Sequence, residues 1–333
     1  MPLRTKIKRG LLNINSGLGK MLGYIARPVP SLGNFFYDCL VWFERVLWDR
    51  VALMFIPVVA SFGTIFYDRR YHRLVEYFTI NGARLRLDLF EKTQRWIYSQ
   101  KIFEAGETRF LISKIKEGDV CVDVGANVGY YTMLLAQQTG QTGKVISIEP
   151  ELGNFKRLTD NQVLNNFHNI RLYNCAVGQK TGKSILNINP LNHGGNSLIP
   201  FKSYKTGDVV FSREKMIEEY GEKELFQSVD LMRLDDILLN EKIKKVDVLK
   251  IDVEGFELEV LRGAKNLIET RALKYLVCEI DNKVTRNSIF EFMISNGYCA
   301  YRVSYSGLVD IIPYEPSTIS SLHGNALFIR TEQ

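Results

Sequence analysis

The segment that most constrains the fold is Asp119–Met133, which reads DVCVDVGANVGYYTM. An apolar run reaches Asp123, Gly125 and Gly129 follow it, and a second apolar stretch begins at Tyr130. Glycines at these two positions let the backbone turn tightly and approach a ligand before a helix starts. The segment therefore predicts a buried strand, a ligand-binding turn and a helix.

Strand-like and helix-like stretches alternate after this turn. This alternation is typical of βαβ units, so we expect an α/β fold with a doubly wound, mostly parallel sheet and a C-terminal antiparallel strand pair. The predicted strands are 120–124, 145–148, 170–177, 246–251 and 275–280, with the late pair at 299–303 and 326–329, and the predicted helices are 130–138, 155–165, 256–268 and 285–296. Segment 181–228 breaks the rhythm, and its residues 212–225 form a charged helix-like run. We expect an insertion over the active face there.

The first 80 residues differ in composition from the rest. Residues 1–30 hold six of the 43 Lys and Arg residues and no acid, so the remaining chain is balanced at 37 basic against 37 acidic residues. We predict a basic arm and an amphipathic, apolar helical region over 1–80, appended to a domain over 81–333. The uncharged run 51–67 leaves three alternatives open, namely a membrane-spanning helix, a helix on a membrane surface and a buried helix. The arm is compatible with an anionic membrane surface, with nucleic acid or with a solvated tail.

Targeting and cysteine patterns indicate a reducing compartment. No secretory signal is recognisable, and the five cysteines lack C-x-x-C spacing. Three of them, Cys121, Cys175 and Cys278, fall in apolar runs and are expected as buried free thiols. We expect a cytoplasmic protein, and docking on the cytoplasmic membrane face is left open.

A second acid accompanies the turn. Glu149 stands at the end of the next predicted strand, 20 residues beyond Gly129, where a carboxylate can chelate a ribose diol. Asp123 can pair with a cationic amino-acid group, but it would repel a pyrophosphate, and the Gly-Lys-Ser/Thr of a P-loop is absent. S-Adenosylmethionine, a cationic nucleoside without phosphate, fits this pattern. A tight turn without a ligand is the alternative.

The segment Val246–Ala264, VDVLKIDVEGFELEVLRGA, supplies a second strand-to-helix turn. Asp252 and Glu254 should face the same crevice as Asp123, because ligands bind outside the carboxyl ends of the strands of such sheets. One of the two acids could act as general base on an acceptor hydroxyl, or each could merely cap the helix. His193, in the irregular insertion, is a further candidate base, or a solvated loop histidine.

Further oxygen ligands follow the next predicted strand. Together with Asp252, the side chains of Glu279, Asp281 and Asn282 could bind Mg²⁺, or they form a hydrogen-bonded polar rim. We predict S-adenosylmethionine as the cofactor and leave open whether these four residues also hold Mg²⁺.

Three segments resemble the FkbM family of S-adenosylmethionine-dependent methyltransferases: DVGANVGYYT at 123–132, IEP at 148–150 and LKIDVEGFELEVLRGA at 249–264. The resemblance covers residues 85–330. It implies a class I methyltransferase (Rossmann-like) fold and O-methylation of a hydroxyl on a sugar, glycan, glycolipid or natural product. It also implies that Glu149 binds the ribose, that the adenine lies near Ala176, and that Asp252 and Glu254 face the acceptor. The methionine part would be held by Asp123, Gly125, Asn127 and Gly129. Ala126, Thr132 and Asp252 complete the expected cofactor-binding set.

Two other functions stay open at this point. The basic arm suggests an RNA methyltransferase, although the balanced domain shows no basic groove and no aromatic platform. A binding protein that keeps the fold without catalysis is the other alternative, against which the intact acids argue. We expect a small-molecule or glycan partner with a free hydroxyl.

Overall fold

A computed structural model describes residues 74–89, 91–100, 102–190, 192–206, 209–282, 284–303, 311–313 and 324–331. They belong to the second of two units of the chain, which spans His72–Gln333. The basic arm and the apolar run 51–67 lie outside the described residues, so what the sequence predicts for them stays a prediction. Within the described ranges, no helix combines the length and the apolar character needed to cross a membrane.

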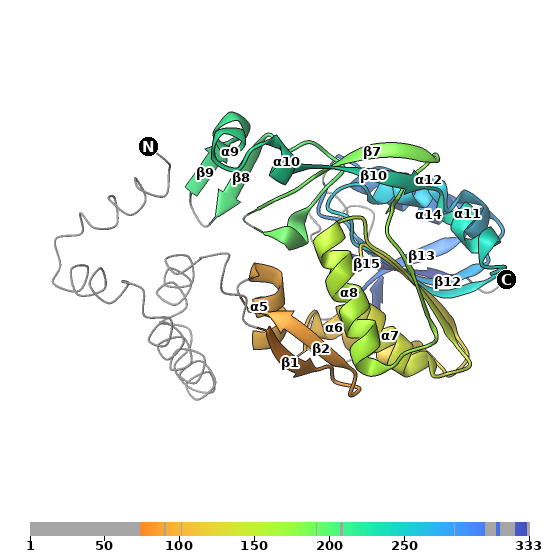
Figure 1. Cartoon of the computed structure of the whole chain (residues 1–333). Helices are drawn as coiled ribbons and strands as arrows, with labels where there is room; N and C mark the ends of the chain where they lie inside the picture. The colour runs from red at the N-terminus through yellow and green to blue at the C-terminus, as the bar shows by residue number, and fades with distance from the viewer. Residues whose placement is uncertain are drawn as a thin grey trace. The chain divides into compact units, whose positions relative to one another are not determined.

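An eight-stranded sheet forms the centre of the domain (Figure 1). Its strand order is β14-β13-β15-β12-β11-β3-β4-β5. The strands from β12 to β5 are parallel, and β15 is antiparallel to both of its neighbours. The bounds are β3 Val120–Val124, β4 Lys144–Ile148, β5 Ile170–Tyr173, β11 Val246–Ile251, β12 Leu273–Glu279, β13 Tyr298–Val303, β14 Ile311–Pro313 and β15 Asn325–Arg330. The predicted class I methyltransferase sheet, with its late antiparallel pair, is confirmed.

Helices cover both faces of this sheet (Figure 1), which is why its central strands are apolar on both sides. One core lies between the sheet and α11–α14, and the other between the sheet and α6, α7 and α8. The helix bounds are α6 Ala105–Lys114, α7 Tyr130–Thr139, α8 Leu152–Asn165, α11 Leu234–Asn240, α12 Glu257–Gly263, α13 Lys265–Glu269 and α14 Arg286–Ser295. Cys121, Cys175 and Cys278 are buried free thiols, as predicted.

The crevice of the fold opens where β3 meets β11. From β3 the chain continues to β4 and β5 on one side of β3, and it later returns to β11 and β12 on the other side. The strand order therefore reverses between β3 and β11, and ligands of such sheets bind at the carboxyl ends of the strands at this point. The register pairs Val124 with Ile251, and the Asp252 amide donates to the Val124 carbonyl at 3.0 Å. The two predicted turns therefore lie side by side.

Two predicted elements are each split in the structure. The strand predicted over 170–177 is β5 followed by β6 (Ala176–Val177), because β6 leaves the central sheet and pairs with β10 instead. The helix predicted over 256–268 is α12 and α13, because Ala264 has φ −104° and ψ 21° and so departs from helical geometry.

The predicted insertion forms its own substructure beside the sheet. β6, β10 (Phe226–Met232) and β7 (Gly182–Asn187) make a three-stranded sheet. The remaining elements are the 3₁₀ turn η2 (His193–Gly195), the hairpin β8 (Ser203–Thr206) and β9 (Val209–Ser212), and two helices, α9 (Arg213–Tyr220) and α10 (Glu222–Leu225). The charged run at 212–225 is thus helical, as predicted.

A hairpin and a short helix precede α6. β1 (Leu74–Phe78) pairs with β2 (Arg84–Asp88), and α5 (Lys92–Ser99) follows. The sequence placed residues 74–80 in a helical region, whereas 74–78 form a strand. Cross-strand pairing accounts for the difference, because β1 bonds to β2 along its whole length and Tyr77 is buried against the domain.

Candidate active site

The turn after β3 has the backbone geometry that its glycines predict. Gly125 and Gly129 adopt φ of +83° and +96°, and Asn127 also has a positive φ of 52°. A Cβ atom on Gly125 would lie 1.8 Å from the carbonyl oxygen of Asp252. Only glycine therefore lets the two strand ends approach this closely.

Four predicted cofactor residues lie behind the turn and do not line the pocket described below. Asp123 is 2% exposed and accepts a hydrogen bond from Thr132 Oγ1 at 2.6 Å. Burial raises the pKa of Asp123, and the nearby Lys250 ammonium opposes this effect. Ala126 is buried, and Gly129 packs against Leu158. These residues pack against the turn on the side away from the pocket.

Glu149 lies directly after β4 and lines the pocket described below. Its side chain is 5% exposed, and its two carboxylate oxygens accept from the Asn127 amide at 2.8 Å and from the Glu151 amide at 2.9 Å. Burial raises the pKa of Glu149 to about 7, although these amide hydrogen bonds favour the charged form. The acid is therefore fixed next to the turn that Asn127 belongs to.

One pocket joins the two turns to the insertion. Its floor comes from the ends of β3, β4 and β11, and its opposite wall from residues 186–198. The lining residues are Val124, Gly125, Asn127, Ile148, Glu149, Pro150, Asn154, Cys175, Ala176, Val177, Leu186, His193, Gly194, Asn196, Leu198, Asp252, Val253, Glu254 and Phe256. The structure therefore brings together seven of the residues predicted from sequence: Gly125, Asn127, Glu149, Ala176, His193, Asp252 and Glu254.

A buried lysine, which the sequence reasoning missed, lies beneath Asp252. Lys250 is 2% exposed; its Nζ lies 2.8 Å from Asp252 Oδ2 and 4.6 Å from the centre of the Tyr131 ring. The Tyr131 hydroxyl in turn donates to Glu104 at 2.6 Å. A lysine inside the apolar strand VDVLKI is a signal that could have identified this pair, because lysine is rarely buried unless it has a partner.

Glu254 adopts a strained backbone at the pocket edge. Its φ is 54°, in the left-handed region that non-glycine residues rarely occupy. Its carbonyl accepts from Ser197 Oγ at 2.8 Å, which ties the acid to the insertion. Burial of the carboxyl group, followed by repulsion from Asp252, Glu257 and Asp281, raises the pKa of Glu254 to about 8. Strain of this kind is typical of functional positions.

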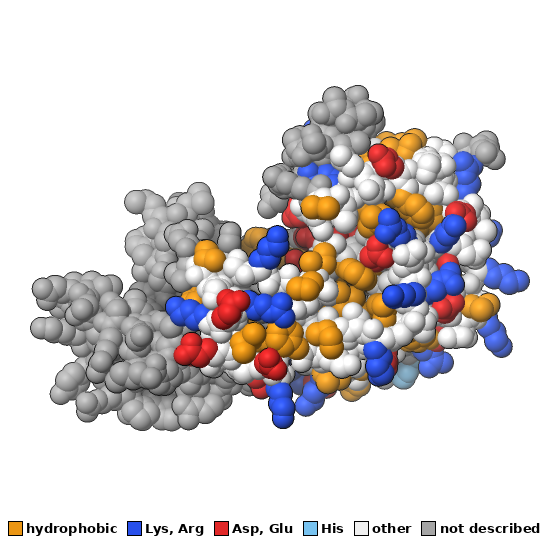
Figure 2. Space-filling model, turned by 90° about the horizontal axis from the view of Figure 1, so that it is seen from above, with side chains coloured by type: hydrophobic (Ala, Val, Ile, Leu, Met, Phe, Trp, Pro, Cys, Tyr) orange, Lys and Arg blue, Asp and Glu red, His pale blue; other side chains and the backbone are white. Residues whose placement is uncertain are grey.

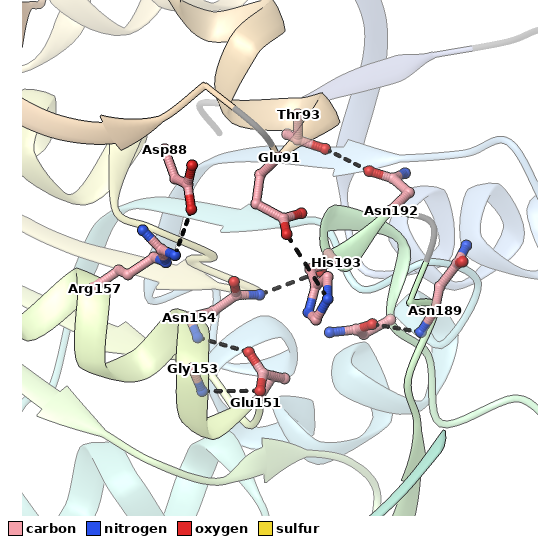
Figure 3. Close-up of polar contacts among 11 residues, drawn as sticks. Asp88, Glu91, Thr93, Glu151, Gly153, Asn154, Arg157, Asn189, Asn192 and His193 are labelled. Atoms are coloured by element: carbon pink, nitrogen blue, oxygen red, sulfur yellow. Dashed lines mark hydrogen bonds and ion pairs between the residues drawn. The ribbon is translucent and has the colours of Figure 1, made fainter. Parts of the chain in front are cut away.

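The wall opposite the floor comes from residues far apart in the sequence (Figure 3). Asn187 and Ser197 form a β-bridge, and the Asn189 amide donates to Asn196 Oδ1 at 2.8 Å. Asn154, from α8, donates to the His193 carbonyl at 3.2 Å. Asn154, Asn196 and the apolar lining residues Leu186, Leu198 and Phe256 carry no local motif, and the sequence reasoning did not find them.

The oxygen ligands considered for Mg²⁺ are used in other ways. Asp281 Oδ1 accepts from the Gly324 amide, Asn282 donates to the Gly255 carbonyl, and Asp252 is paired with Lys250. The pKa of Glu279 is raised to about 10, first by burial and then by the surrounding acids. Among the described residues, no group of three His, Cys, Asp or Glu side chains could hold a metal ion. These residues instead form part of a polar rim.

Charge on the molecular surface is mixed. Figure 2 shows Lys and Arg side chains interspersed with acids on the face that it presents, without one continuous basic patch among the coloured residues. Among the described residues that line the pocket, none is lysine or arginine. This composition suits a ligand without phosphate.

Comparison with known proteins decides the family. The sequence model of the methyltransferase FkbM domain matches residues 123–302, which include both turns, Glu149 and the insertion. The chain belongs to the FkbM methyltransferase family. It is an S-adenosylmethionine-dependent methyltransferase.

Some similar proteins are named for different methyl acceptors. Methyltransferase 1 of Beauveria bassiana is 28% identical over 186 residues, covering 55% of this chain and 69% of that protein. The hexuronic acid methyltransferase AglP of Haloferax volcanii is 24% identical over 201 residues, covering 60% and 72%. The 31-O-demethyl-FK506 methyltransferase FkbM of Streptomyces tacrolimicus is 27% identical over 199 residues, covering 53% and 75%. The crystal structure of methyltransferase FkbM from Methylobacillus flagellatus aligns with a TM-score of 0.39 at 18% identity, over 65% of this chain and 44% of that one.

The pocket fits the cofactor that this family uses. The Gly125 turn brings bare backbone to the pocket, Glu149 offers a carboxylate at the edge of the turn, and Asp252 adds a second carboxylate to the lining. Carboxylates and bare backbone suit a cationic nucleoside, and the lining contains no residue that favours a phosphate. Ala176, between Cys175 and Val177, provides an apolar surface of the kind that an adenine requires.

Proposed function

We propose that this enzyme transfers the methyl group to a hydroxyl oxygen of a sugar or another polyhydroxylated small molecule. One observation carries the proposal: the cofactor-binding turn and the polar wall of the insertion share a single pocket. An acceptor in that pocket would meet the carboxyl groups of Asp252 and Glu254 together with the imidazole of His193 and the amide of Asn196.

The residues act mainly by positioning. When bound, the cofactor supplies a methyl group on a sulfonium, which leaves as a neutral thioether. Lys250 holds the Asp252 carboxylate at 2.8 Å and so fixes a negative charge beside Gly125. The apolar side chains of Val253, Leu186 and Phe256 limit water around the acceptor oxygen. Alignment of a desolvated nucleophile can remove about 7–11 kcal/mol from the barrier to such a displacement.

Glu254 would bind the acceptor next to its reacting oxygen. With a pKa of about 8, this carboxyl is mostly protonated at pH 7, so it can donate one hydrogen bond and accept another. Sugars offer neighbouring hydroxyls for both bonds. The name of AglP, a hexuronic acid methyltransferase, supports a sugar acceptor, and that of the FK506 enzyme supports a natural-product hydroxyl.

Residues 1–73 add a further prediction about location. Their basic arm and the apolar run 51–67 favour a cytoplasmic enzyme that docks on an anionic membrane surface. Co-sedimentation with vesicles that contain phosphatidylserine, compared between the full chain and residues 72–333, tests this. Equal recovery of both in the supernatant would contradict it.

The proposed reaction can be tested without knowing the acceptor. Purified protein is incubated with S-adenosylmethionine that carries a CD₃ group and with an extract of glycans and small molecules from cells that lack the gene. The proposal predicts a product that is heavier by one CD₃ in place of H, with the label on oxygen. Label on nitrogen or carbon, or only in RNA, would contradict it.

A further inference from the structure

The 192–196 wall of the pocket is held rigidly by two helices from outside it (Figure 3). Thr93, in the first turn of α5, donates to Asn192 Oδ1 at 2.9 Å, and Asn154 of α8 donates to the His193 carbonyl. A Cβ atom on Gly194 would lie 2.2 Å from Thr93 Oγ1, so the loop packs directly against α5. His193 is therefore fixed in the pocket wall by contacts that do not use its ring.

Two polar groups of this wall remain available to a ligand. Asn196 Nδ2 is buried and has no hydrogen-bond partner, although Asn196 lines the pocket and its Oδ1 is satisfied by the Asn189 amide. The His193 ring is partly exposed at the same wall. An unsatisfied buried donor is costly unless a ligand pairs with it, so this wall indicates a ligand with oxygen acceptors.

Glu91 faces the ring of His193 from the start of α5 (Figure 3). Its Oε1 lies 3.8 Å from His193 Nε2, and its side chain is largely buried. A carboxylate at this distance attracts any positive charge that forms on the ring. The pair is thus arranged to stabilise positive charge on His193.

The other titratable groups that line the pocket have different partners. Glu149 is engaged by two backbone amides, and Asp252 by Lys250. Cys175 carries a thiol whose pKa burial raises to about 12. Glu254 has a pKa of about 8, so it is mostly protonated at pH 7 and is a poor proton acceptor there. His193 is the lining group best placed to receive a proton.

We propose that His193 is the catalytic base and that Glu91 is its positioning residue, an inference that rests on the proposed O-methylation. The acceptor O–H bond breaks as the oxygen bonds to the methyl carbon, and the carbon–sulfur bond breaks with its electron pair going to sulfur. The proton moves to the His193 ring, and the Glu91 carboxylate stabilises the imidazolium. Water takes the proton after the product leaves.

The test compares four variants with the wild type in the extract assay described above: His193→Asn, His193→Ala, Glu91→Gln and the double variant Glu91→Gln/His193→Asn. The exposed His168 provides a matched control, His168→Asn. Removing a general base lowers the transfer rate by about 10²–10⁴-fold. We therefore expect at least about a 100-fold fall for His193→Asn and about a tenfold fall for Glu91→Gln. We also expect imidazole in the buffer to restore part of the rate of His193→Ala.

Calorimetry with S-adenosylhomocysteine separates this role from a structural one, and we expect its Kd to change less than about twofold in each variant. Because Glu91 acts through His193, Glu91→Gln should have no further effect in the His193→Asn background. A His193→Asn rate within threefold of the wild type, no rescue by imidazole, or an undiminished effect of Glu91→Gln in the double variant would each overturn the inference. A wild type that transfers no label at all would instead overturn the proposed function.

Discussion

Cofactor affinity should depend on pH through Glu149. The free enzyme holds this carboxyl with a pKa raised to about 7, because it is buried. Two ribose hydroxyls that donate to the carboxylate would favour its charged form, so binding should lower the pKa. Between the Glu149 pKa of the complex and that of the free enzyme, the complex therefore holds fewer protons than the free enzyme. Affinity for the cofactor then falls as the pH falls.

The size of this pH dependence follows from the raised pKa of Glu149 in the free enzyme. At pH 8 nearly all Glu149 is ionised in the free enzyme, whereas at pH 6 about one molecule in ten is. The Kd for S-adenosylhomocysteine should therefore rise about tenfold from pH 8 to pH 6. Near pH 7, binding should release about half a proton, which appears in calorimetry as an enthalpy that depends on the ionisation enthalpy of the buffer.

Two variants assign this pH dependence to one residue. Glu149→Gln should bind more weakly and lose the dependence. Glu257, whose pKa burial also raises to about 7, accepts from the Gly255 amide and does not line the pocket, so Glu257→Gln should keep the dependence. A Kd that is constant from pH 6 to pH 8 in the wild type, or an unchanged slope in Glu149→Gln, would refute the reasoning.

Four further substitutions, one of them a control, test the supporting contacts. Gly125→Ala should abolish detectable binding of S-adenosylhomocysteine in calorimetry, because its Cβ would overlap the Asp252 carbonyl, and full affinity would contradict this. Lys250→Met should lower the free energy of unfolding in urea by about 3 kcal/mol, since it leaves the buried Asp123 and the partly exposed Asp252 without their cation, and a change below about 1 kcal/mol would count against it. Arg157→Met should cost about 3 kcal/mol because its aspartate partner is fully buried, whereas Lys183→Met, in an exposed pair, should cost less than about 1 kcal/mol; equal costs would be the contrary result.

Local patterns were sufficient to predict the floor of the site. Gly125, Glu149 and Asp252 each follow directly after a buried strand, and parallel strands bring their carboxyl ends to one edge of the sheet. Sequence spacing therefore determined which residues would meet there. Asp123 ends the same strand, but its side chain turns back to Thr132 and does not line the pocket, so its role toward the cofactor stays a prediction.

The opposite wall could not be predicted in the same way. Thr93 and Asn192 are 99 residues apart, and Glu91 meets His193 only because α5 packs on the 192–196 wall. These contacts depend on how the insertion folds back over the strand ends, which no periodicity in the sequence encodes. Lys250 is the exception, since its position within an apolar strand was visible and its partner, Asp252, lies two residues on.

Mass spectrometry of glycans, lipids and small molecules from cells with and without the gene tests the central claim most directly. We predict that, when the gene is removed, one compound carries a free hydroxyl in place of one methoxy group and is therefore lighter by about 14 Da. The wild-type gene should restore that group, and a gene that encodes Gly125→Ala should not. Identical methylation in both strains, or restoration by the Gly125→Ala gene, would contradict the assignment of this pocket as the site of methyl transfer.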